Sequence, residues 1–356
     1  MSGGPVGQGA AGLHAAEDTI LRERGRLFSW DAYIVGCAFD PTGAFAAWAS
    51  GDGTVRLLAL EEGAELVTVP VHDGAVLALT SDCLASRLLS GGDDGRLCSV
   101  SVAGGVAIAE WPGQWVEHVL VIPGRSPRRA AVVGKTICLF DGDGNRLKTL
   151  DHPSTVTGLA VDASGMRLAA SHNGGASLWS PAAEEDRPCR LEWKGSHIGI
   201  AISPDARFVV SAMQENALHG WRLADGAHLR MTGYRSKTKS MSFSANGRWL
   251  ATSGAESIVC WPFDGPGPMG RPPLELAAGD TVAVTRVACH PQQEIVAAGY
   301  ADGLVLLAES DEAGKVLPVA APGRGPVSAL AWSADGRWLA FGTETGFAAI
   351  VDFAPR

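Results

Sequence analysis

Three basic side chains stand close together in a chain that is otherwise acidic. Arg235, Lys237 and Lys239 alternate with Ser and Thr within one short segment. The chain has only six lysines and a formal net charge of −9 at pH 7, so two neighbouring lysines concentrate positive charge. Clustered cations bind carboxylates and phosphates through charge-assisted hydrogen bonds. We interpret the segment either as a solvated loop or as a contact for an acidic or phosphorylated partner.

Histidines and aspartates recur at equivalent positions of a repeated pattern, and both residue types can bind metal ions. His72 and His152 share one phase, and Asp52, Asp94 and Asp302 each precede a glycine. No His-x-x-x-His pair and no His, Asp and Glu cluster with metal spacing accompanies them. A hydrogen-bonded structural histidine and a turn aspartate that binds its own backbone are the simpler interpretations. We expect no metal and no other cofactor.

The segments expected to form inner strands lack the groups that catalysis needs. Residues 34–39, 76–79, 156–161 and 327–332 contain no charged residue. General acid–base catalysis needs converging titratable groups, and no glycine-rich phosphate loop follows a strand. The chain therefore has no candidate catalytic residue.

A repeated string of turn and strand must position these residues. Ser244-Ala245-Asn246-Gly247-Arg248-Trp249-Leu250-Ala251 recurs with one change as Ser333-Ala334-Asp335-Gly336-Arg337-Trp338-Leu339-Ala340. Asn-Gly and Asp-Gly favour tight hairpin turns, so each copy predicts an antiparallel hairpin. A second string follows a period of roughly 40–45 residues, which is typical of four-stranded propeller blades. Its eight copies begin at residues 52, 94, 134, 173, 215, 255, 302 and 345.

The repeats resemble the WD40 family over residues 30–353. Phe243-Ser244-Ala245-Asn246-Gly247, Leu250-Ala251-Thr252-Ser253-Gly254 and Asp52-Gly53-Thr54-Val55-Arg56-Leu57 are similar to its repeat consensus. The resemblance implies an all-β fold, a single closed β-propeller. We expect eight four-stranded blades, with seven as the alternative because the third copy is the most degraded.

Several residues match structural positions of the family repeat. His72, Ser90 and Asp94 come nearest to its hydrogen-bonded His–Ser–Asp–Trp set, although Val100 replaces the tryptophan. No copy keeps the whole set. The family's tryptophan is kept, without the aspartate that follows it in the family, at Trp179, Trp221 and Trp261.

Ring closure predicts a role for the start of the folded chain. The eighth copy supplies only three strands before the chain ends at Arg356. An uncovered outer edge would expose unpaired backbone donors and acceptors. We expect the strand at residues 25–30 to be the missing fourth strand. Residues 1–18 are expected to be a disordered Gly- and Ala-rich tail without a secretory signal, and residues 19–356 to form the propeller.

The resemblance implies a non-enzymatic scaffold that binds a protein or peptide through the top face of the ring. The alternatives are a small-ligand or metal-linked accessory protein and, less favoured, an enzyme with its active site at the channel mouth. Besides Arg235, Lys237 and Lys239, the residues expected on the binding face are Trp115, Glu117, His118, His197, Gln214 and Arg286.

Composition limits the kinds of partner and compartment. The net negative charge argues against a nucleic-acid partner. The sequence contains no run of about 20 apolar residues, so we expect no membrane span. The seven scattered cysteines form no pairing motif, which favours a reducing compartment. We expect a cytoplasmic monomer.

Overall fold

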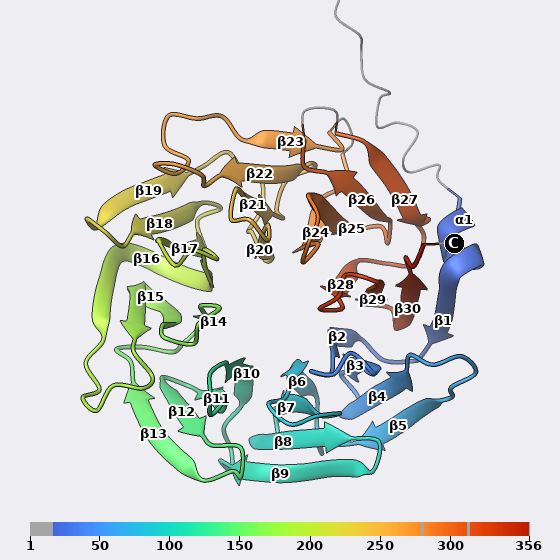
Figure 1. The fold of residues 1–356 in the computed structure, drawn as a ribbon, viewed down its shortest axis with the longest axis horizontal. Coiled ribbons are helices and arrows are strands. Elements are labelled where there is room, and N and C mark those ends of the chain that lie inside the picture. Colours follow the sequence, from blue (N-terminus) through green and yellow to red (C-terminus); the bar gives the residue numbers. More distant parts are fainter. Residues whose placement is uncertain (1–16, 279–280, 312–313, 356) are drawn as a thin grey trace, which may run out of the picture.

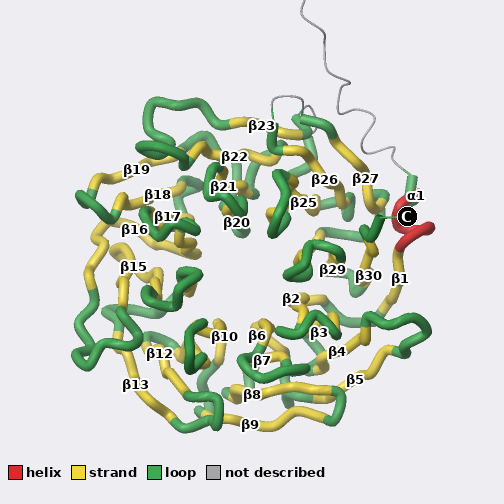
Figure 2. Tube along the Cα trace, viewed as in Figure 1, coloured by secondary structure: helices red, strands yellow, loops and turns green. Residues whose placement is uncertain are grey.

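The computed structural model describes residues 17–278, 281–311 and 314–355. They form a ring of antiparallel sheets around a central axis (Figure 1). Strands and loops make up nearly all of the ring, and the one helix in the described part is α1, Thr19–Arg24 (Figure 2). No helix among the described residues is long and apolar enough to cross a bilayer.

The repeated turn explains why the chain folds into hairpins. In the turn that joins the first two strands of one unit, the Ser244 hydroxyl donates to Asn246 Oδ1 at 2.8 Å. The same hydroxyl accepts the backbone N–H of Trp249 at 3.0 Å. Gly247 takes φ +71°, a left-handed conformation that favours glycine. The side chains thus replace backbone hydrogen bonds where the chain reverses.

The first three sheets follow the chain in order, each from an inner to an outer strand. Every neighbouring pair is antiparallel, as expected for hairpin-connected strands. Their strands are β2 Ile34–Phe39, β3 Phe45–Ser50, β4 Thr54–Ala59 and β5 Leu66–Pro70; β6 Val76–Ser81, β7 Leu88–Gly92, β8 Arg96–Ser101 and β9 Gly104–Glu110; and β10 Val116–Ile122, β11 Arg128–Val133, β12 Thr136–Phe140 and β13 Arg146–Asp151.

The fourth sheet has six strands and contains two sequence repeats. The long strand β16 pairs with β15 through its first part, Leu178↔Cys189 to Asn173↔Ser196. It pairs with β17 through its second part, beginning at His197↔Met213. The outer strand of one repeat therefore continues directly into the inner strand of the next. The strands are β14 Gly158–Val161, β15 Leu168–Trp179, β16 Cys189–Ile202, β17 Phe208–Met213, β18 Leu218–Arg222 and β19 Ala227–Met231.

The remaining three sheets complete a total of seven. The expected propeller is confirmed, but its eight sequence copies lie in seven hydrogen-bonded sheets rather than in eight separate blades. The continuous strand β16 is the physical reason for this difference. The remaining strands are β20 Met241–Phe243, β21 Trp249–Thr252, β22 Ile258–Pro262 and β23 Leu274–Leu276; β24 Val284–Cys289, β25 Ile295–Tyr300, β26 Val305–Glu309 and β27 Val316–Ala320; and β28 Val327–Trp332, β29 Trp338–Thr343, β30 Phe347–Asp352 and β1 Gly25–Ser29.

The last sheet closes the ring with strands from both ends of the chain. β1 pairs antiparallel with β30, from Gly25↔Val351 to Ser29↔Phe347. Figure 1 shows the N-terminal strand in blue beside the C-terminal strands in dark red. The prediction that residues 25–30 supply the missing strand is thus confirmed for 25–29.

A second connection anchors the start of the described chain. Asp18 accepts the backbone N–H of Ala321 at 2.6 Å and pairs with the guanidinium of Arg324. The expected disordered tail falls largely on residues 1–16, which lie outside the described residues. Asp18, by contrast, is nearly buried against the loop after β27.

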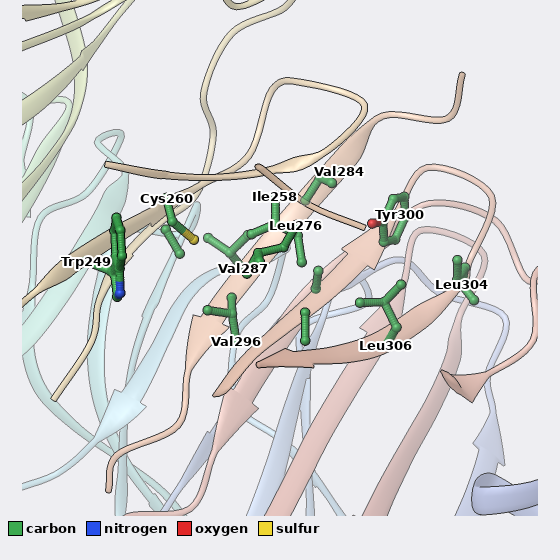
Figure 3. Packing of buried hydrophobic residues seen from close by; sticks show 13 residues of the cluster. Trp249, Ile258, Cys260, Leu276, Val284, Val287, Val296, Tyr300, Leu304 and Leu306 are labelled. Carbon is green, nitrogen blue, oxygen red and sulfur yellow. The ribbon is translucent and has the colours of Figure 1, made fainter. Parts of the chain in front are cut away.

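Neighbouring sheets share apolar cores. In one of them, Ile258 and Leu276 from the sheet β20–β23 meet Val287 and Val296 from the next sheet (Figure 3). Gly299 permits a close approach, because a Cβ there would lie 2.4 Å from Cγ1 of Val327 in the following sheet. Burial of such side chains supplies the main stabilisation of a ring of this kind.

Candidate functional site

Loops from every repeat gather on one face of the ring. In each repeat the inner strand begins on this face, and the turn between the second and third strands returns to it. Backbone hydrogen bonds join the two, for example Gln214 N–H to Ser196 O at 2.9 Å and Ser253 N–H to Ser240 O at 3.0 Å. We call it the top face. The described segments that lead into inner strands there are 30–33, 71–75, 111–115, 152–157, 193–196, 232–240 and 321–326.

A buried tyrosine fixes the basic segment 232–240 on this face. The Tyr234 hydroxyl accepts a hydrogen bond from Trp261 Nε1 at 2.7 Å and lies 2.7 Å from Thr252 Oγ1. Burial raises the pKa of Tyr234 to about 12, so its hydroxyl stays neutral. Tyr234 therefore fixes the start of the segment, and the residues that follow it lead into β20 from a defined position.

The three cations of this segment differ in their partners. All three side chains are exposed, but Arg235 Nη1 lies 2.6 Å from Glu256 Oε1 and its charge is neutralised. Within the described part of the chain, Lys237 and Lys239 form no ion pair. The uncompensated positive charge of the segment therefore resides on the two lysines.

Lys237 and Lys239 line a pocket of about 440 Å³, which we call the lysine pocket. It lies where three successive sheets meet on the top face, and no acidic residue belongs to its lining. The other lining residues are Asn216, Ser236, Ser253, Ala283, Val284 and Thr285.

A second pocket of about 330 Å³ adjoins the same segment. Tyr234, Val259, Trp261 and Pro273 supply its apolar surface, and we call it the aromatic pocket. Residues 232–235 line this pocket, whereas 236, 237 and 239 line the lysine pocket. Glu256 and Glu275 also line the aromatic pocket. One short stretch of chain thus separates a pocket of mixed aromatic and acidic lining from a cationic one.

Other residues expected on the binding face lie in several environments. Trp115 is 59 % exposed in the loop before β10, and Gln214 is exposed in the turn after β17. Glu117 and His118 are half-buried on the inner strand β10, and burial lowers the pKa of His118. Arg286 is half-buried on β24. Trp115 and Gln214 are thus open to a partner, whereas the others contribute less surface.

The position of Arg286 follows from its hydrogen bonds. Its Nε donates to Ser328 O at 2.7 Å and its Nη1 to Thr285 O at 3.2 Å. Burial lowers the pKa of the guanidinium. The side chain therefore connects two inner strands and is not directed freely into solvent.

His197 is placed differently from its expected role. Its side chain is 0 % exposed, with Nδ1 2.6 Å from Ser211 Oγ and Nε2 3.0 Å from Trp193 O. Burial lowers its pKa. A partner on the surface cannot reach this ring, so the expectation of a contact residue is corrected to a buried one.

The structural repeat positions form the contacts that their types suggest. His72 Nδ1 lies 2.9 Å from Asp94 Oδ1, and its Nε2 lies 2.9 Å from Ser90 Oγ. Burial alone would raise the pKa of Asp94, but hydrogen bonds from the Arg96 backbone and from His72 hold that pKa near 2. The three residues sit together at the top of the second sheet.

In the next matching set, Trp179 Nε1 donates to His152 Nε2 at 2.9 Å. Burial lowers the pKa of His152 to about 4. Trp221 is buried in the following repeat, where its ring packs edge-on against His219. These tryptophans and histidines belong to the interior between strands.

The turn aspartates bind their own loops. Asp52 accepts the backbone N–H of Thr54 at 3.1 Å and pairs with Arg56 at 2.8 Å. Asp302 Oδ1 accepts the backbone N–H of Leu304 at 3.1 Å. Across the described residues, no group of three or more His, Cys, Asp or Glu is arranged to hold a metal ion.

Sequence reasoning missed two features of the site. The aromatic pocket depends on Pro273, which follows a long loop, so no repeat phase pointed to it. The lysine pocket depends on Ser253 and Thr285 from neighbouring sheets. The only signal in the sequence was that Ser253 lies at the turn between the second and third strands, which every repeat places on the top face.

The ring of antiparallel sheets closed by β1 and β30 defines the chain as a β-propeller. The family model of the WD domain, G-beta repeat, matches residues 144–180, a span that includes the hydrogen-bonded His152 and Trp179. This match and the propeller fold together support a relationship to the WD40-repeat propellers. A search of curated proteins finds no match. WD40 propellers generally bind protein partners and are typically not enzymes.

Proposed function

We propose that this protein is a non-enzymatic interaction scaffold whose top face binds an acidic or phosphorylated segment of a protein partner. The observation that carries the proposal is the pair of exposed lysines, Lys237 and Lys239, without an ion pair in the described structure. A cationic pocket on an otherwise acidic protein attracts negatively charged ligands selectively.

Trp115 supplies a second kind of contact on the same face. Exposed tryptophans are frequent anchors of protein interfaces because they bury a large area at a small cost in conformational entropy. A partner that covers Trp115 and also reaches the lysine pocket would combine apolar and electrostatic contacts. We therefore propose a protein partner and neither a nucleic acid nor a membrane.

The cysteines support the proposed compartment. Every cysteine is a free thiol, and burial raises the pKa of Cys37 and of Cys289 to about 12. Buried thiols such as these two behave as inert apolar residues, as expected of a protein in a reducing compartment. We propose a cytoplasmic monomer.

Affinity capture from the native cell tests the proposal when it is followed by titration of the purified partner. The partner should bind the wild type and should lose about tenfold or more in affinity with Lys237→Ser/Lys239→Ser and with Trp115→Ala. The matched control is Lys148→Ser/Lys315→Ser, because these lysines pair with Asp186 and Glu309. Equal affinity of all variants would refute binding by the top face.

A further inference from the structure

We infer that the lysine pocket is built for a phosphoryl group, so that the top face reads a phosphorylated side chain rather than a carboxylate. This inference rests on the proposed function, because it names the ligand of the same face. The charges, the spare donors and the neighbouring aromatic pocket each support it.

The charge of the pocket matches a phosphorylated side chain. Lys237 and Lys239 contribute two positive charges, and none of the residues that line the pocket is acidic. The nearby Arg235 is already neutralised by Glu256 at 2.6 Å. A phosphorylated side chain carries a charge of about −1.5 to −2 at neutral pH, whereas a single carboxylate carries about −1. One phosphoryl group therefore balances both lysines, whereas one carboxylate balances only one of them.

Ser253 adds a preorganised donor to the pocket. Its hydroxyl oxygen accepts the backbone N–H groups of Lys239 at 3.1 Å and Ser240 at 3.0 Å. A hydroxyl oxygen has two acceptor sites, so both are occupied and the hydroxyl hydrogen remains as a donor. No acceptor for that hydrogen occurs among the described residues, although the side chain is only 1 % exposed.

The number of donors suits a tetrahedral oxyanion. Two ammonium groups and the Ser253 hydroxyl can each donate to one of the three terminal oxygens of a phosphoryl group. Asn216 Nδ2 uses one hydrogen for Arg235 O at 3.2 Å and keeps a second. Ser236 and Thr285 hydroxyls donate to backbone carbonyls, so they hold the walls in place.

The aromatic pocket specifies what lies beside the phosphorylated residue. Tyr234 and Lys237 belong to the two pockets and are three residues apart, which an extended chain spans in about 10 Å. A peptide that places its phosphoryl group on the lysines can therefore insert an apolar side chain beside Trp261 and Pro273. The ligand is thus a phosphorylated residue with an apolar residue about two to three positions away.

The first experiment titrates purified full-length protein with inorganic phosphate and with a degenerate phosphoserine peptide library. The matched libraries carry serine or glutamate in place of phosphoserine, and all are measured at one ionic strength. Phosphate and the phosphoserine library should bind the wild type, and the phosphoserine library should bind about tenfold or more tightly than the glutamate library. No binding of phosphate or of phosphoserine peptides would overturn the inference.

The second experiment repeats the titrations with variants. Lys237→Ala/Lys239→Ala should weaken phosphoserine binding about tenfold or more, whereas Lys148→Ala/Lys315→Ala should leave it unchanged. Ser253→Ala also removes the acceptor of two backbone N–H groups, so it should lower the melting temperature, and it should weaken phosphoserine binding less than the loss of both lysines does. Phosphoserine binding that survives the loss of both lysines would place the ligand elsewhere and overturn the inference.

The outcomes separate this inference from the proposed function. If glutamate and phosphoserine peptides bind equally through Lys237 and Lys239, the face recognises carboxylates, and only the phosphoryl inference falls. If phosphoserine binds through these lysines but the natural partner does not depend on them, the phosphoryl pocket stands and the proposed route of partner binding falls.

Discussion

Asp82 and Arg129 form a buried ion pair that joins two neighbouring sheets. Arg129 donates from Nε to Asp82 Oδ1 at 2.6 Å and from Nη2 to Oδ2 at 3.0 Å, and each residue is 2 % exposed. The Ser99 hydroxyl donates to the same carboxylate at 2.6 Å. Burial alone would raise the pKa of Asp82, but these donors hold it below its ordinary value. The turn after β6 is thereby fixed to β11.

Breaking this pair should destabilise the ring strongly. Asp82→Asn or Arg129→Met leaves one buried charge without its partner, which costs about 3–5 kcal/mol of unfolding free energy. Denaturant unfolding of both single variants and of the double variant measures the cost and the coupling. The exposed pair of Arg235 and Glu256 is the control, and Arg235→Ala should cost less than about 1 kcal/mol. Single variants as stable as the wild type would contradict the assigned role.

His152 should make the stability of the protein depend on pH. Its Nε2 accepts the Trp179 N–H, so protonation there would break the hydrogen bond, and its folded pKa is about 4 against an ordinary value of 6.5. Between these values the unfolded chain binds the additional proton. The stabilisation is therefore complete above pH 6.5 and is lost as pH falls towards 4, by up to about 3 kcal/mol.

Thermal melts between pH 4 and pH 7.5 test this dependence. His152→Gln retains an acceptor for Trp179 but cannot titrate, so its melting temperature should fall less steeply between pH 6.5 and pH 4. Parallel curves for the wild type and the variant would show that another group controls the stability in this range.

Removal of the closing strand should open the ring. Without β1, the outer edge of β30 loses the pairing from Gly25↔Val351 to Ser29↔Phe347. Deletion of residues 1–31 should lower the melting temperature sharply or abolish soluble expression. Deletion of residues 1–16 is the control, because it retains Asp18 and β1, and it should melt like the full chain. Equal melting of both truncations would disprove closure by this strand.

Tyr234→Phe should loosen the anchor of the basic segment. The change removes the acceptor of the Trp261 N–H and a partner of the Thr252 hydroxyl. A buried donor without its acceptor costs about 1–3 kcal/mol. Denaturant unfolding should show this loss, and hydrogen exchange in residues 232–240 should quicken. Unchanged stability and exchange would indicate that the segment is held by other contacts.

The repeats allowed the fold to be predicted because each copy carries its own turn chemistry. Ser244 and Asn246 bind their turn locally, and such short-range contacts are visible in a single sequence. The need for a fourth strand likewise located β1 in advance. The merging of two repeats through β16 was not predictable, because the continuity of a strand across a short connection depends on the sheets on both sides.

The binding face was only partly predictable for a similar reason. Lys237 and Lys239 were recognisable from their scarcity in an acidic chain. The neutralisation of Arg235 by Glu256 and the burial of His197 depend on neighbours that are distant in the sequence. Asp82 and Arg129 are 47 residues apart and do not occupy equivalent positions of the repeat, so the sequence did not indicate that they pair.

Hydrogen exchange of the protein with and without its captured partner tests the central claim most directly. The account predicts that amides in residues 232–240 and in the loop around Trp115 exchange more slowly in the complex. It also predicts that this protection is lost for residues 232–240 when Lys237→Ser/Lys239→Ser is mixed with the same partner. Protection confined to the opposite face, around the turns at residues 244–248 and 333–337, would contradict binding by the top face.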